Sequence, residues 1–91
     1  MAKAKKKGNY IVLVERVQTR DMYFLESVSY SKRNFKLIPI KDIANAKTYA
    51  SADTVQAEID FIAKCDMSVA CAYDTPDNWK LYFKQHYDMD L

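Results

Sequence analysis

Hydrophobic side chains recur every three or four positions in the segment SADTVQAEIDFIAKC, residues 51–65. That spacing places Val55 and Ile62 on one face of an α-helix, with polar side chains on the opposite face. Ser51 or Asp53 can accept hydrogen bonds from the free amides of the first turn. The pattern therefore predicts one main helix that begins near residue 52 and packs its apolar face on the rest of the chain.

Three segments before this helix have the composition of β-strands. Residues 10–17, YIVLVERV, are apolar on both faces and indicate a central strand, and residues 22–30, MYFLESVSY, follow after a short turn. Residues 35–38 form a third strand that Pro39 ends or confines to a sheet edge, because proline cannot donate to the ladder. The three strands predict an antiparallel meander, and residues 41–46 then form one helical turn.

The segments after the main helix are less uniform. Residues 67–73, MSVACAY, indicate a buried strand in which the small Ala70 and Ala72 let the helix sit close. For residues 76–87 two structures remain open. The run Thr75-Pro76-Asp77 is a typical helix start, and the following aromatic residues recur at helical spacing, so a helix is favoured. The alternation of apolar and polar residues in WKLYF is also compatible with a strand that pairs with residues 67–73. The predicted fold class is α+β, a small antiparallel sheet of a three-strand meander plus one strand, packed on one main helix, with a second C-terminal helix as the favoured ending.

Composition indicates one folded domain. The chain has 91 residues, of which 49% are apolar and 13% aromatic, enough for one modest core over residues 10–91. Residues 1–9 are expected to be a disordered basic tail. Because the tail carries four of the positive charges and the formal net charge is +2, the remainder is mildly acidic. No apolar run approaches the roughly 20 residues of a membrane span, and no secretion signal is visible, so we expect a cytoplasmic protein with no membrane partner.

The inventory of reactive residues argues against catalysis. One glycine in the whole chain removes phosphate-cradling loops from consideration. His86 is the single histidine, and neither Cys65 nor Cys71 stands at metal-ligand spacing from it or from each other. A Cys–His nucleophilic pair would need an accessible thiol, whereas Cys71 lies in an apolar strand and both cysteines are expected to be reduced. We therefore expect a protein that is not an enzyme and uses no cofactor or metal.

Aromatic residues exceed what so small a core hides easily, and tyrosine and tryptophan are typical of binding hot spots. Phe61 lies off the main helical stripe, where it either packs under the C-terminal segment or marks a contact surface. With the acidic C-terminal third of the chain, these residues indicate a protein partner that meets some or all of Phe61, Asp74, Asp77, Trp79, Tyr82, Asp88 and Asp90.

Nucleic-acid binding is the alternative. Lysines of the tail can neutralise phosphates, and aromatic residues on strands can stack on bases. This alternative assigns binding to Lys3, Lys5, Lys6, Lys7, Arg33 and Lys36. Association of two or more copies of the chain through a strand edge or through Phe61 is also open.

The succession of YIVLVERV, then MYFLESVSYSKRNFKLIPIKDIANAKTYAS, then a helix that begins at the serine resembles small proteins encoded in phages and prophages of Gram-positive bacteria. The resemblance covers residues 10–64. Such proteins include inhibitors of host defence systems, among them anti-CRISPR proteins, which are small non-enzymatic binders. The resemblance implies an inhibitor of a host defence or nucleic-acid enzyme, acting in the host cytosol. Acidic residues after Asp66 would then occupy a basic channel, with carboxylates in place of phosphates.

Overall fold

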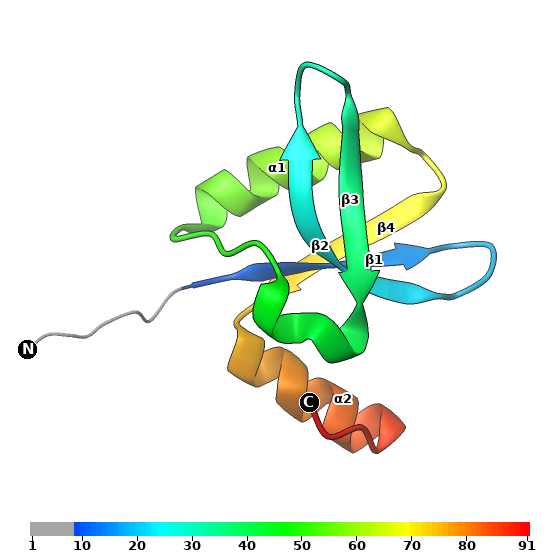
Figure 1. The fold of residues 1–91 in the computed structure, drawn as a ribbon, viewed down its shortest axis with the longest axis vertical. Coiled ribbons are helices and arrows are strands. Elements are labelled where there is room, and N and C mark those ends of the chain that lie inside the picture. Colours follow the sequence, from blue (N-terminus) through cyan, green and yellow to red (C-terminus); the bar gives the residue numbers. More distant parts are fainter. Residues whose placement is uncertain (1–8) are drawn as a thin grey trace, which may run out of the picture.

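A computed structural model describes residues 9–91, and the tail lysines of the nucleic-acid hypothesis lie outside this range. Four strands form one antiparallel sheet in the order β3-β2-β1-β4. The strands are β1 (Ile11–Arg16), β2 (Met22–Ser29), β3 (Asn34–Pro39) and β4 (Val69–Asp74). The predicted α+β class and the meander of the first three strands are confirmed (Figure 1).

Strand β1 is central, as its apolar composition predicts. Its first four residues are all buried, because both faces of the sheet are covered at this strand. Strand β2 has an irregularity between Leu25 and Ser27, after which the β2–β3 hairpin continues without β1 (Figure 1). At Leu25, where β2 no longer pairs with β1, the backbone of Lys47 lies beside β2 instead. The Lys47 amide donates a hydrogen bond to the Leu25 carbonyl at 2.9 Å.

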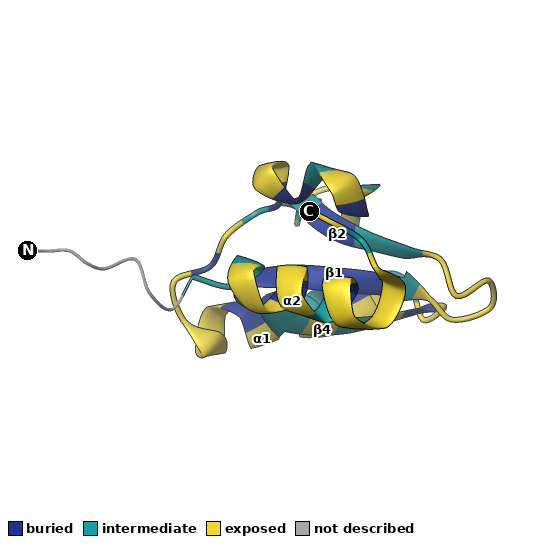
Figure 2. Ribbon diagram, turned by 90° about the horizontal axis from the view of Figure 1, so that it is seen from below, coloured by how far each residue is buried: buried dark blue, intermediate teal, exposed yellow. Residues whose placement is uncertain are grey.

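Two helices cover opposite faces of the sheet. Helix α1 (Ala52–Cys65) packs on Val12, Val14 and Leu25, whereas α2 (Pro76–Tyr87) packs on the other face of β1. The short 3-10 helix η2 (Ile40–Asn45) lies on the α2 side and covers the predicted turn at residues 41–46 except for Ala46, which is extended. Figure 2 shows the buried strand β1 behind α2, whose outer side is exposed.

Helix α1 begins where the sequence predicts. Ser51 is the N-cap, and its hydroxyl accepts a hydrogen bond from the Thr54 amide at 3.2 Å. Of the two predicted caps, Ser51 therefore serves, while Asp53 lies in the first turn and complements the positive end of the helix dipole.

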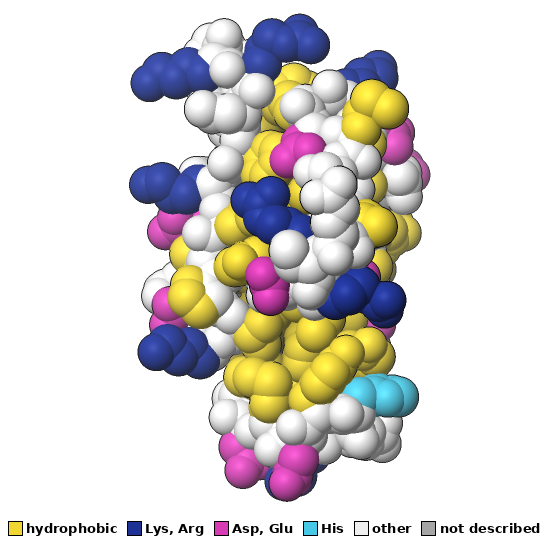
Figure 3. All heavy atoms as spheres, turned by 90° about the vertical axis from the view of Figure 1, so that its right-hand side faces the viewer, with side chains coloured by type: hydrophobic (Ala, Val, Ile, Leu, Met, Phe, Trp, Pro, Cys, Tyr) yellow, Lys and Arg dark blue, Asp and Glu magenta, His cyan; other side chains and the backbone are white. Residues whose placement is uncertain are grey.

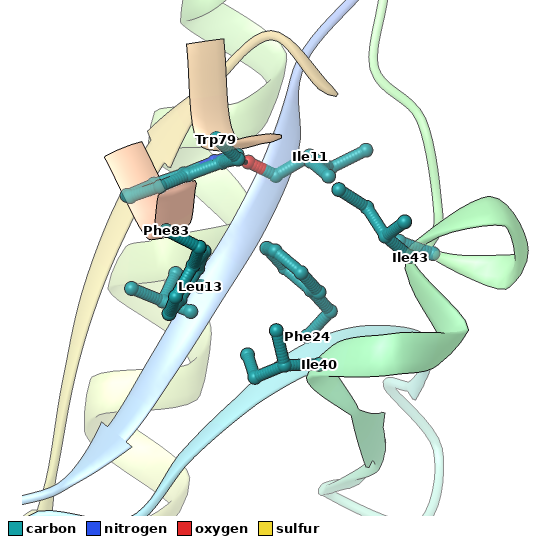
Figure 4. Packing of buried hydrophobic residues seen from close by; sticks show 8 residues of the cluster. Ile11, Leu13, Phe24, Ile40, Ile43, Trp79 and Phe83 are labelled. Atoms are coloured by element: carbon teal, nitrogen blue, oxygen red, sulfur yellow. Dashed lines mark hydrogen bonds between the residues drawn. The ribbon is translucent and has the colours of Figure 1, made fainter. Parts of the chain in front are cut away.

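Residues 76–87 are helical, so the favoured alternative is confirmed. The Thr75 hydroxyl accepts a hydrogen bond from the Asn78 amide at 3.2 Å, and Pro76 stands in the first turn. Trp79 and Phe83 point into the core against Leu13 and Phe24 (Figure 4). A strand would have turned Leu81 to the same side as Trp79 and Phe83, whereas in the helix Leu81 is 55% exposed and the two rings, one turn apart, are buried.

Strand β4 differs from the prediction in one respect. It lies at a sheet edge, and Ala70 and Ala72 are exposed on the side opposite α1 rather than packed against the helix. Val69, Cys71 and Tyr73 pack toward the α1 core instead. The expectation that the two alanines let the helix approach is therefore wrong, because alternation along the strand turns them to the other face.

Candidate interaction surfaces

An aromatic surface lies at the C-terminal end of α2, with one apolar side chain on the outer side of the helix beside it. We call it the α2 surface and define it by Leu81, Tyr82, His86 and Tyr87. Leu81 is 55% exposed and Tyr87 is 50% exposed, while the half-buried Tyr82 ring lies against the His86 ring with centroids 4.5 Å apart. Figure 3 shows apolar side chains gathered at this end of the molecule beside the single histidine.

Buried aromatic rings of the core contact the α2 surface and fix it in place. Tyr82 packs edge-on against Trp79 and Phe83, with centroids 5.6 and 5.2 Å away. The Trp79 indole donates a hydrogen bond to the Ile11 carbonyl of β1 at 3.2 Å (Figure 4). Trp79, one of the predicted contact residues, is therefore a buried support and not an exposed contact. The exposed rings above it are fixed rather than free to rearrange.

The turn between β1 and β2 lies next to this surface. Arg20 donates to the Glu15 carboxylate at 2.7 Å, and this pair raises the pKa of Arg20. Partial burial, followed by the neighbouring Tyr87, raises the pKa of Tyr82, and Glu15 adds a smaller effect. The surface thus combines apolar rings with one ion pair at its border.

The four predicted aspartates do not form one acidic patch. Asp74 and Asp77 lie at the N-terminal end of α2, where the Asp74 carboxylate accepts hydrogen bonds from the Thr75 amide and the Asn78 side chain, both at 2.8 Å. Asp88 and Asp90 follow the other end of the helix, roughly 18 Å away at 1.5 Å per residue.

The second pair of aspartates is partly neutralised. Lys84 lies 3.3 Å from an Asp88 carboxylate oxygen and 3.1 Å from one of Asp90, and the pair raises the pKa of Lys84. Asp88 also adopts a left-handed conformation that ends the helix. These acids therefore border the α2 surface at the Tyr87 end, whereas Asp74 and Asp77 shape the start of the helix.

Phe61 lies on the other side of the sheet. Its ring packs on Tyr30 of the β2–β3 turn, with centroids 4.5 Å apart, and Tyr30 is 58% exposed. The expectation that Phe61 packs under the C-terminal segment is wrong, because α1 and α2 cover opposite faces. Phe61 consequently belongs to a second surface, separate from the α2 surface.

That second surface is basic. The β2–β3 turn carries exposed Lys32 and Arg33, with Lys36 exposed on the neighbouring strand. Arg33 has a positive φ of 55°, which closes the turn. We call the side chains of Tyr30, Lys32, Arg33 and Phe61 the hairpin surface. Of the two described basic residues of the nucleic-acid hypothesis, Arg33 belongs to this surface, whereas Lys36 lies on the opposite face of the sheet, because its strand neighbours Phe35 and Leu37 pack toward the α1 core.

A buried carboxylate is the feature that sequence reasoning missed. Glu58 on α1 is 3% exposed, and its Oε1 accepts hydrogen bonds from the Lys47 ammonium at 2.8 Å and from the Tyr49 hydroxyl. Burial raises the pKa of Glu58 and raises the pKa of Tyr49 to about 12. The position of Glu58 one turn from Val55 and Ile62 was the available signal, since a charge on that flank needs a partner.

The cysteines and histidine do not form a nucleophilic pair. Cys71 and Cys65 are free thiols on the α1 side of the sheet, whereas His86 lies on α2 at the other face. Burial raises the pKa of the Cys71 thiol to about 11, which leaves it protonated at neutral pH. Residues 9–91 contain no group of three metal-ligating side chains placed to hold an ion.

Within residues 9–91, no helix has the length and apolar character needed to cross a membrane. No protein-family model matches the chain, and neither a curated protein nor a solved structure matches it significantly.

Proposed function

We propose that this chain is a non-catalytic protein-binding module that contacts its partner through the α2 surface. The observation that carries the proposal is the gathering of the exposed His86 and Tyr87 with the half-buried Tyr82 at the C-terminal end of α2, next to the exposed Leu81, on a helix whose inner side is fixed in the core. Tyrosine supplies a large contact area with few rotatable bonds, so rings that are already ordered lose little entropy on binding.

The border of the surface fits a protein partner as well. Binding hot spots commonly have apolar rings at the centre and charged groups at the rim. Arg20 and Glu15 lie at one side of the rings, and Lys84 with its two aspartates lies at the other. These charges can select a partner and orient it, while the rings contribute most of the affinity.

The specific form of the proposal is an inhibitor of a host defence or nucleic-acid enzyme, which rests on the resemblance to phage proteins. In this form Asp88 and Asp90 contact basic side chains of the enzyme, since they border the α2 surface. Reversing Asp88 and Asp90 to lysine should then weaken binding more than reversing Asp74 and Asp77. Equal effects of the two double variants would contradict the acidic-contact mechanism.

A matched pair of substitutions tests the α2 surface. Leu81→Asp places a charge in the surface at a half-exposed position, and Met67→Asp makes the same kind of change at a turn residue that is 91% exposed and outside it. Partner capture from the natural host's lysate should fall at least about tenfold for Leu81→Asp, which is the range of a hot-spot residue, and stay unchanged for Met67→Asp. Equal capture by both variants would refute the surface assignment.

The hairpin surface supports a second candidate function, the binding of single-stranded nucleic acid. Its exposed Lys32 and Arg33 follow Tyr30 in the turn, and the Tyr30 ring lies against Phe61, a combination that suits phosphates and bases together. Lys32→Glu with Arg33→Glu should abolish binding to a labelled oligonucleotide and flatten its salt dependence. Binding that is insensitive to this change would remove the hairpin from the candidate sites.

A further inference from the structure

Among residues 9–91, no strand pairs with the outer edge of β4. It is the outermost strand on its side and pairs with β1 over all six of its residues without a bulge. Its sequence VACAY holds neither charge nor proline before Asp74. An edge strand of this kind presents a regular row of free backbone groups, which is the usual site for addition of another strand.

The register identifies which groups face outward. The Val17 amide donates to the Ser68 carbonyl at 3.0 Å, so this opposed pair is of the hydrogen-bonded type. Such pairs alternate along an antiparallel ladder, which makes the pairs at Ala70 and Ala72 hydrogen-bonded to β1. The N–H and C=O groups of the alternate residues therefore point away from the sheet, and these residues are Val69, Cys71 and Tyr73.

The other edge of the sheet is protected in a way that β4 is not. Strand β3 ends at Pro39, which has no amide donor, and carries the exposed Lys36 in its middle. Lysine and proline on an edge strand are common obstacles to strand addition. The contrast between the two edges makes β4 the side at which this sheet can be extended.

We propose that the occupant of the β4 edge is the β4 strand of a second copy, paired antiparallel about a two-fold axis at Cys71. In this register Cys71 faces Cys71 of the other copy, and Val69 faces Tyr73. All three outward residues then find hydrogen-bonding partners in the second copy, giving six backbone hydrogen bonds and a continuous eight-stranded sheet.

The side chains that meet in this register are compatible. A β-branched residue faces an aromatic one at Val69 and Tyr73, which is a favourable cross-strand pair. Ala70 faces Ala72 on the open side of the sheet, where neither is large enough to clash. Asp74 faces Ser68, so no like charges oppose each other.

Helix α1 allows the two copies to approach. Its Glu58 and Phe61 flank points toward Tyr49 and the β2–β3 turn, so the opposite flank lies on the β4 side. That flank carries the exposed Ala52, Gln56 and Ala63, of which the two alanines are small. Six backbone hydrogen bonds and this short helix contact form a small interface, and the dimer is therefore expected to be weak and concentration-dependent.

Two variants that differ only in the residue at position 72 test the register. Both carry Ala70→Lys, and they differ in having Ala72→Lys or Ala72→Glu; positions 70 and 72 are exposed in the single copy, so both variants should fold. Across the proposed axis the first variant opposes lysine to lysine twice, and the second opposes lysine to glutamate twice. Sedimentation velocity over a concentration series, under reducing conditions, should give a dissociation constant at least about tenfold higher for the first than for the second.

The unmodified chain should dimerise under the same conditions, with circular dichroism as a check that all three proteins are folded. A wild-type chain that stays monomeric up to its solubility limit would overturn the proposal. Equal dissociation constants for the two folded variants would also overturn it, because the charges would then not face each other. The α2 surface is not part of this interface, so either result leaves the proposed function to its own test.

Discussion

Removal of the Glu58 carboxylate should destabilise the fold strongly, although no partner surface is changed. Glu58 lies on α1 and fixes the segment before this helix through Lys47 and Tyr49. That segment in turn continues the sheet, because Tyr10 and Tyr49 exchange backbone hydrogen bonds at 2.8 Å. Glu58→Ala therefore disconnects a helix from the chain segment that leads into it.

The magnitude follows from what each partner does after the substitution. Alanine keeps the β-carbon, so the substitution removes one buried methylene, which contributes about 0.8 kcal/mol. The Tyr49 residue is 5% exposed, so its hydroxyl is left without an acceptor at a cost of roughly 1–3 kcal/mol. The Lys47 side chain is 38% exposed and can turn to water, so we assign it no further loss. The expected total is about 2–4 kcal/mol, a large part of the roughly 5–15 kcal/mol that stabilises a typical domain.

A double-mutant cycle with Tyr49→Phe isolates the hydrogen bond. Tyr49→Phe alone should cost about 1 kcal/mol, since Glu58 keeps Lys47 as a partner. In the Glu58→Ala background the same change should be neutral or stabilising, because it removes the orphaned hydroxyl. Urea denaturation followed by circular dichroism measures all four free energies of unfolding, with the exposed Asp60→Ala on the same helix as a control expected to stay within about 0.5 kcal/mol.

Additive effects within about 0.5 kcal/mol would refute the reasoning, because residues that do not interact show that behaviour. A loss below about 1 kcal/mol for Glu58→Ala would refute it as well, since it would place the carboxylate in water.

Three further predictions concern stability. Trp79→Ala should cost about 3–5 kcal/mol in urea denaturation, because it removes a buried ring and its hydrogen bond to Ile11; a loss below 1 kcal/mol would contradict the packing of α2. Ser51→Ala should cost about 1 kcal/mol through the lost cap at Thr54, whereas Ser51→Asp should keep most of the stability. Burial raises the pKa of Tyr49 from 10.0 to about 12, so its contribution is complete below pH 10 and is lost as the pH rises toward 12. Tyr49→Phe should therefore lose less stability than the wild type between pH 10 and pH 12, and parallel pH profiles would contradict this.

Much of the fold follows from local patterns in the sequence. The alternation of apolar residues sets the strands, and the helical spacing after Ser51 sets α1 within a residue of its predicted start. Strand order and the exposed side of β4 do not follow in this way, because they depend on which strand β1 accepts as its second neighbour. The packing partner of Phe61 is not predictable for the same reason. The sequence shows that Phe61 lies off the apolar stripe of the helix, but only the packed chain brings its ring against Tyr30.

The sequence predicts which types of residue form the candidate sites, but not which of these residues lie together in the folded chain. Tyr82 and Trp79 are both aromatic residues at helical spacing, yet one is part of an outer surface and the other donates a hydrogen bond inside the core. The aspartates share a sign, but the length of α2 separates them into two pairs. Glu58 shows the converse, since its chemistry depends on Lys47 and Tyr49, which only the packed chain brings to it.

The most direct test of the central claim is one affinity capture from lysate of the natural host, made in parallel with three forms of the chain. The forms are the wild type, Leu81→Asp in the α2 surface, and Lys32→Glu with Arg33→Glu in the hairpin surface, each with nuclease and a high-salt wash. The account predicts one protein that survives both treatments, is lost with Leu81→Asp and is retained by the hairpin variant. Recovery of mixed nucleic acid that depends on the hairpin and washes off with salt would contradict it.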